Sequence, residues 1–218
     1  WKFLTVKYFV VPCKVKHPNI AHILQDLAKI YLFQRRYEEA EPLFLQSLEI
    51  FKNSWGTENH HFAIGLNDLA ELYSLQGRYE EAEPLFLQSL EIFKKPLGEG
   101  HQRSFASNLS GLAKFYLHQG RYEEAESLFL QSLEIEKKVL GEEHSDVNVA
   151  SKFHSLAVLY DKQERYKEAE SFFLQALELF KKLFGEEHQN IARSLKDLAS
   201  LYDSQGRYEE AEPLYLQA

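Results

Sequence analysis

One six-residue motif recurs five times along the chain at nearly constant spacing. Arg-Tyr-Glu-Glu-Ala-Glu begins at Arg36, and it returns at Arg78, Arg121, Arg165 (with lysine as its third residue) and Arg207, in steps of 42, 43, 44 and 42 residues. A period of this length predicts an array of similar units whose hydrophobic core grows by stacking. Such an array builds an extended surface, so the repeat favours binding over catalysis.

Each repeat contains two patterns typical of amphipathic helices. In the second copy, residues 63–76 place apolar side chains at i, i+3, i+4 and i+7, namely Leu66, Leu69, Ala70 and Tyr73. Residues 79–94 carry a second stripe of helical spacing. Gly77 lies between them, where a left-handed residue ends many helices. The first helix of each pair is called helix A below, and the second is called helix B.

Small residues predict where the two helices touch. Ala70 and Ala82 lack bulk, so the backbones of helices A and B can approach closely at these positions. We expect Tyr73, Tyr79 and Phe86 to fill the space around that contact. Neither helix can bury its stripe alone, so each needs its partner and the next repeat.

Two other features of the motif lead to structural predictions. Its glutamates fall in the first turns of helix B, where carboxylates interact favourably with the positive helix end, so we interpret the acidic run as a solvated face. Arg35 and Glu164 stand where three other copies have glycine. We expect both residues to take the left-handed conformation, at a cost of about 1 kcal/mol each.

The stripe of the second copy, Leu66-x2-Leu69-Ala70-x2-Tyr73 followed by Ala82-x3-Phe86, is similar to the tetratricopeptide repeat. The same set returns in every copy, around the tyrosines Tyr31, Tyr73, Tyr116, Tyr160 and Tyr202, called stripe tyrosines below. The longer period and the segment Leu140 to His144 resemble the kinesin-light-chain type of this repeat. The resemblance implies an all-α fold, an α-α superhelix (solenoid) of antiparallel helix pairs with the A helices on its concave side.

The repeat also sets the predicted domain organisation. Five tandem helix pairs are expected at about 17–58, 59–100, 101–143, 144–187 and 188–218, the last one truncated. Residues 1–16 are interpreted as a degenerate remnant of a preceding repeat. The absence of methionine and the early stop of the fifth copy lead us to expect a longer natural protein.

Composition restricts the class of partner. A net charge of −8 argues against duplex nucleic acid and anionic membrane as partners. The single cysteine, Cys13, rules out an internal disulfide framework and fits a reducing compartment, so we predict a cytoplasmic protein. No apolar run reaches the roughly 18 residues of a membrane span.

The sequence contains no recognisable catalytic or phosphate-binding motif, so we predict no enzyme activity and no cofactor. His17, His101, His144 and His188 fall in the loops between pairs, and we interpret them as capping or packing residues. Zinc needs ligands at about 2 Å from one centre, whereas successive repeats are expected about 20 Å apart. We therefore predict no metal site, and we place His60 and His61 on the loop surface.

Binding specificity is expected at the variable, exposed positions of the A helices. These positions form four rows, which stand nine, six and two residues before each stripe tyrosine and one residue after it. From these rows we predict a peptide-binding set of Gln25, Lys29, Asn67, Glu71, Ser110, Lys114, His154, Arg193 and Lys196. Kinesin-light-chain-type repeats usually carry asparagine in the row six before the tyrosine, and only Asn67 keeps it.

Charge suggests what this face binds. The four rows carry four cations against three carboxylates, a balance of +1 in a chain of net charge −8. We therefore predict a protein-interaction scaffold that holds a protein or peptide ligand of acidic character on the concave helix-A face. The alternative is a structural spacer or self-assembling array within a larger multidomain regulatory protein. In that alternative the uncapped termini, with Leu214 and Tyr215 exposed, associate end to end.

Overall fold

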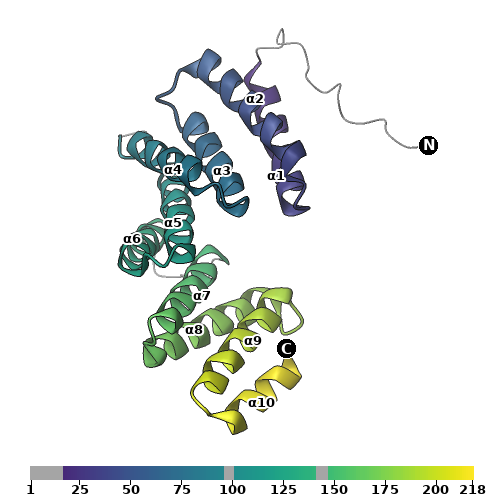
Figure 1. Cartoon of the computed structure of the whole chain (residues 1–218), viewed down its shortest axis with the longest axis vertical. Coiled ribbons are helices and arrows are strands. Elements are labelled where there is room, and N and C mark those ends of the chain that lie inside the picture. Colours follow the sequence, from purple (N-terminus) through teal and green to yellow (C-terminus); the bar gives the residue numbers. More distant parts are fainter. Residues whose placement is uncertain (1–16, 96–100, 141–146) are drawn as a thin grey trace, which may run out of the picture. The chain divides into compact units, whose positions relative to one another are not determined.

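The computed structural model of the protein describes residues 17–95, 101–140 and 147–218. Within these ranges the regular elements are ten α-helices, α1 to α10: Pro18–Phe33, Tyr37–Trp55, His60–Leu75, Tyr79–Phe93, Gln102–His118, Tyr122–Leu140, Val147–Lys162, Tyr166–Phe184, Gln189–Ser204 and Tyr208–Gln217. Odd-numbered helices are A helices and even-numbered helices are B helices, and the two helices of a pair run antiparallel (Figure 1). The predicted all-α, helix-pair fold is confirmed. The interpretation of residues 1–16 lies outside the described residues.

The chain forms two compact units, residues 1–111 and 112–218, and the division falls inside α5. The helices begin close to the predicted positions. One difference is that α3 starts at His60, three residues before the predicted start, because the side chain of Asn59 accepts a hydrogen bond from the Phe62 amide at 2.9 Å and caps the helix there.

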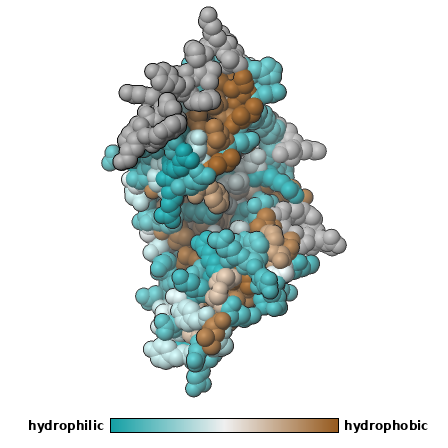
Figure 2. All heavy atoms as spheres, turned by 90° about the vertical axis from the view of Figure 1, so that its right-hand side faces the viewer, coloured by the Kyte–Doolittle hydropathy of each residue, from teal (hydrophilic) through white to brown (hydrophobic). Residues whose placement is uncertain are grey.

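The core follows the repeated small and aromatic positions. Ala70 and Ala82 are fully buried, and Tyr73 and Phe86 are buried beside them. The expectation for Tyr79 is wrong: its side chain is 42% exposed. On the face drawn in Figure 2, hydrophilic side chains cover most of the surface and hydrophobic ones gather in separate patches, as expected when the apolar stripes are turned inward.

The turn inside each pair uses a left-handed residue. Gly77 has φ +76°, and the next amide, of Arg78, donates to the Tyr73 carbonyl at 2.8 Å, which is the bonding pattern of a Schellman motif. Arg35 and Glu164 occupy the same place with φ +59°. Their predicted left-handed conformation is confirmed.

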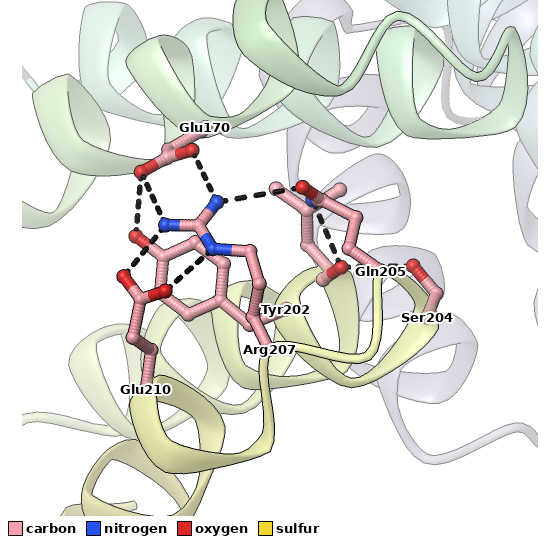
Figure 3. A network of polar contacts seen from close by, with 7 residues as sticks. Glu170, Tyr202, Ser204, Gln205, Arg207 and Glu210 are labelled. Atoms are coloured by element: carbon pink, nitrogen blue, oxygen red, sulfur yellow. Dashed lines mark hydrogen bonds and ion pairs between the residues drawn. The ribbon is translucent and has the colours of Figure 1, made fainter.

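A tyrosine, an arginine and a glutamate connect successive pairs. Arg207 places its guanidinium 4.0 Å from the ring centroid of Tyr202 and donates to Glu170 on α8 of the preceding pair at 2.8 Å (Figure 3). The Tyr202 hydroxyl donates to the same carboxylate at 2.8 Å, and Arg207 also binds Glu210 at 2.6 Å. We call this arrangement the Tyr–Arg–Glu contact.

The same contact is present at two other junctions. Arg78 and Tyr73 bind Glu41 at 3.0 and 3.1 Å, and Arg165 and Tyr160 bind Glu126 at 2.9 and 3.0 Å. The prediction of a solvated acidic run is therefore wrong for the last glutamate of the motif. This residue is half-buried and joins two repeats, and the motif arginine at the start of α10 makes no side-chain capping bond.

The contact changes the ionisation of its members. Hydrogen bonds from Arg207, and then from Tyr202, hold the pKa of Glu170 below its usual value despite burial. Burial first, and then the hydrogen bond and negative charge of Glu170, together raise the pKa of Tyr202 to about 12. Both shifts favour the ionic state drawn in the contact, a carboxylate facing a neutral phenol.

We expect replacement of Glu164 by glycine to raise the free energy of unfolding by about 1 kcal/mol, because it removes the cost of a side chain in the left-handed region. Gly206 at φ +74° is the matched control, since nothing lies within 4 Å of an added Cβ and Gly206→Ala tests conformation alone. Urea unfolding should show opposite shifts for the two variants. An unchanged or lowered stability of Glu164→Gly would contradict the expectation.

We expect Glu170→Ala to destabilise the second unit by about 1–3 kcal/mol, since it leaves Tyr202 and one side of Arg207 without their acceptor. Glu212→Ala is the control, because Glu212 holds the same motif position and is exposed, so its change should stay within about 0.5 kcal/mol. A double-mutant cycle with Arg207→Ala, measured by urea unfolding, gives the coupling. Equal effects of Glu170→Ala and Glu212→Ala would show that the contact adds no stability.

Candidate functional site

The A helices of the second unit enclose a hollow of about 290 Å³. Its walls come mainly from α5, α7 and α9, and Phe180 of α8 adds a buried apolar side. Six of its lining residues belong to the four rows that the sequence placed on the binding face: Lys114, Leu117, Ser151, His154, Val158 and Arg193. The fold thus brings residues from three repeats to one concave place on the A-helix side, called the hollow below.

Two predicted cations of this face make no ion pair within the described part of the chain. Lys114 on α5 and Lys196 on α9 are both exposed, and Lys114 lines the hollow. Arg193 is also exposed, with its Nε 3.8 Å from the Asp197 carboxylate one turn along α9. These three side chains are therefore accessible to a ligand that carries negative charge.

The row six before the stripe tyrosine is largely used for packing between A helices. Gln25 is buried and donates to Asp68 on α3. His154 is buried as well, and its Nε2 lies 2.8 Å from Asp197 on α9. In both cases the residue bonds to the position five before the tyrosine of the next repeat. Gln25 and His154 therefore hold neighbouring A helices together.

The remaining predicted residues differ in exposure. Asn67 is half-buried and accepts a bond from Asn108 on α5 at 3.1 Å. Ser110 is buried, whereas Glu71 is exposed. Lys29 is half-exposed and its Nζ lies 2.9 Å from Asp68. The structure brings Lys114, His154 and Arg193 to the hollow, and it places Gln25, Lys29, Asn67 and Glu71 in the first unit.

Asp68 is a buried partner of two predicted binding residues, Gln25 and Lys29, and the sequence pattern did not single it out. Its carboxylate is almost fully buried on α3; burial raises its pKa, and the nearby Lys29 ammonium and the Gln25 amide offset part of that rise. Asp197 plays the corresponding part for His154. A signal was present, since an aspartate five before the stripe tyrosine occurs in three copies: Asp26, Asp68 and Asp197.

The loop histidines divide into two groups. His17 and His188 cap α1 and α9, each accepting from the amide two residues later at 3.3 and 3.2 Å, so the capping interpretation is confirmed for them. His144 lies outside the described residues. The placement of His60 and His61 on the loop surface is wrong, because they begin α3 and are half-buried.

The spacing argument against shared histidine sites fails at one junction. The ring centroids of His60 and His101, from successive repeats, are only 4.3 Å apart. Nevertheless, among the residues that the structure describes, no group of three or more His, Cys, Asp or Glu side chains is arranged to hold a metal ion.

Models of the tetratricopeptide repeat match residues 20–61, 63–103, 106–146 and 148–218, which together span most of the chain. The chain belongs to the tetratricopeptide repeat family. Among solved structures it is similar to a Podosopora anserina putative kinesin light chain with nearly identical repeats, at 26% identity and a TM-score of 0.73, over 93% of this chain and 94% of that one. The kinesin-light-chain type of the repeat is thereby supported.

Two more distant structures share the fold. BtubC (BKLC) from P. vanneervenii has 21% identity and a TM-score of 0.75, over 91% of this chain and 78% of that one. A Rap protein complexed with competence and sporulation factor has 17% identity and a TM-score of 0.74, over 89% and 52%. A search of curated proteins found no match. Among the described helices of this tetratricopeptide repeat protein, none has the length and apolarity needed to span a membrane.

The two exposed lysines at Lys29 and Lys196 should respond differently to truncation. Lys29→Ala removes the ammonium beside the buried Asp68, so we expect a loss of about 1–3 kcal/mol in unfolding free energy. Lys196→Ala is the matched control, with an expected change within about 0.5 kcal/mol. Urea unfolding at neutral pH measures both. Equal, small effects would show that Lys29 is available to a ligand rather than used in the fold.

Proposed function

We propose that this tetratricopeptide repeat protein is a non-catalytic interaction scaffold that binds a peptide or a partner domain on its A-helix face. The observation that carries the proposal is the hollow of the second unit, which is lined from α5, α7 and α9 by positions that vary between otherwise similar repeats. Variable side chains on a constant framework are the positions at which a repeat array can be specific for one ligand. A cytoplasmic location, inferred from the single cysteine, belongs to the same proposal.

The chemistry of the hollow supports an acidic ligand. Lys114, His118 and Arg193 line the hollow. Lys196 follows Arg193 by about one turn on α9. The apolar part of the wall comes from Leu117, Val158 and Phe180. A peptide with one apolar side chain and flanking carboxylates matches this combination, since apolar contact supplies affinity while charge supplies orientation and association rate.

One solved structure of the same fold contains a bound partner. The Rap protein of the same fold is complexed with competence and sporulation factor. The similarity in fold, at low sequence identity, supports binding as a class of function. The identity of the ligand has to be argued from the side chains of this chain. The alternative of a spacer or self-assembling array stays a prediction of the sequence, and no described contact bears on it.

The test is a peptide array probed with the labelled chain, followed by fluorescence anisotropy on the peptides that bind. Lys114→Glu combined with Lys196→Glu should weaken binding of acidic peptides by about tenfold or more, because two accessible cations become anions. Lys167→Glu combined with Lys182→Glu is the matched control, with the same change in net charge on exposed positions of α8.

Two results are decisive. Loss of binding in the Lys114/Lys196 variant alone, together with weaker binding of peptides in which Gln replaces Glu, supports the A-helix face as the site. If every recovered peptide binds the Lys114/Lys196 variant as well as the wild type, or if the control variant loses binding equally, the proposed face is wrong.

A further inference from the structure

Four imidazole rings lie next to one another in the first unit. His22 is in the second turn of α1, His60 and His61 begin α3, and His101 directly precedes α5. The ring centroids are 4.6 Å apart for His22 and His61, 3.7 Å for His60 and His61, and 4.3 Å for His60 and His101. Each ring contacts the next, so this histidine cluster links helix A of the first three pairs.

The cluster rests on the aromatic end of α2. His22 lies 5.0 Å from the buried ring of Phe51, and His61 lies 5.6 Å from Phe51 and 4.6 Å from Trp55. The four histidines are half-buried, so aromatic and imidazole rings replace part of the water that would otherwise solvate them. At the junction of α7 and α9 in the second unit, the positions equivalent to His22 and His61 are Ser151 and Asn190, which line the hollow. The stack of histidines is thus particular to the first unit among the described residues.

Burial and the neighbouring rings disfavour a positive charge on His60 and His61. Burial first, and then the like charges of His60, His22 and His101, together lower the pKa of His61 to about 4. Burial and the neighbours His101 and His22 also lower the pKa of His60. The charged neighbours that lower the pKa of His60 and His61 are thus other histidines of the cluster. Protonation of one imidazole therefore raises the free-energy cost of protonating the next.

Charged side chains on the surrounding elements are the possible counter-ions of the cluster. The elements that carry the cluster also bear Asp26 and Lys29 on α1, Glu49 and Lys52 on α2, Glu58 in the loop before α3, Asp68 and Glu71 on α3, Lys94 and Lys95 at the end of α4, and Arg103 on α5. Two of the carboxylates are engaged elsewhere: Glu58 pairs with Lys95, and Asp68 pairs with Lys29. They cannot serve the imidazoles without giving up those bonds.

We propose that the histidine cluster is an acid-sensitive joint of the first unit, which holds α1, α3 and the residues at the start of α5 together while its rings are neutral and loosens them when the rings are protonated. Two imidazolium rings within about 5 Å repel each other, and the aromatic surface of Phe51 and Trp55 offers them little water. The second unit has no comparable stack among its described residues, so the joint acts on one part of the array only.

The direction of the pH effect follows from the shift. His61 takes a proton more readily in the unfolded chain, near pH 6.5, than in the folded one, near pH 4. Its contribution to stability is therefore complete above about pH 6.5 and is lost as the pH falls from there toward 4. Carboxylates with lowered pKa, such as Glu170, affect stability only at pH values below their usual range. A comparison between about pH 7.5 and about pH 5 thus avoids the carboxylates with lowered pKa. Asp68, whose pKa is raised by burial, is present in both the wild type and the histidine variant, so the difference between these two proteins reports on the histidines.

The experiment is urea unfolding of the whole chain at these two pH values. The test variant combines His60→Gln with His61→Asn, the residues that the fifth repeat carries as Gln189 and Asn190. We expect the wild-type midpoint to fall on acidification and the fall to be at least about halved in the variant. His118→Gln, an exposed position on α5, is the control and should fall like the wild type. An equal fall in the wild type and the double variant would overturn the proposal.

A second measurement keeps the test valid if the double variant folds poorly. Imidazole resonances of the wild-type protein are followed by NMR from about pH 8 to about pH 4, with hydrogen exchange of the helix amides. A His61 midpoint well below 6.5, with amides of α1 and α3 losing protection before those of α9, supports the joint. A His61 midpoint at the value of free histidine, or uniform loss of protection, overturns it.

Discussion

The contact between a motif arginine, the stripe tyrosine and a glutamate of the preceding helix pair is the interaction on which the array depends. One arginine ends the left-handed turn, begins helix B, stacks on the tyrosine and bridges two carboxylates, as Arg207 does with Glu170 and Glu210. Charge-assisted bonds and a cation over a ring are each stronger than a neutral surface contact. Because this single residue fixes both the turn and the junction, the pairs that meet at Glu41, Glu126 and Glu170 are set against each other in the same way.

That arrangement explains why function has to be sought elsewhere. The motif is committed to the framework, and so are part of the A-helix rows: Gln25 and His154 bond to aspartates of the next repeat. Accessible side chains such as Lys114 and Lys196 are positioned by the framework, but the framework does not need them for its stability. Substitutions on a surface of this kind can change the ligand without loss of the fold, as is common in repeat proteins.

Differences between copies are coupled across junctions. Glu136 on α6 stands where three other copies have Phe51, Phe93 and Phe180, and it pairs at 3.1 Å with Lys152 on α7, both side chains being almost fully buried. A buried ion pair stabilises little against an apolar alternative, but loss of one partner is costly, so the two residues must change together. The histidine cluster and the hollow are a second such difference, with rings in one unit and smaller polar side chains in the other.

The sequence by itself determined the helices, their pairing and the left-handed turns, because hydrophobic periodicity, buried alanines and the residue after each A helix are local signals repeated five times. It also pointed to the A-helix rows, since those positions vary while the framework does not. Only the tertiary structure decided which variable residues are accessible. Whether Gln25 reaches a ligand or Asp68, and whether His60 meets water or His101, depends on how one repeat is rotated against the next. That rotation comes from packing between residues about 42 positions apart, and no local pattern contains it.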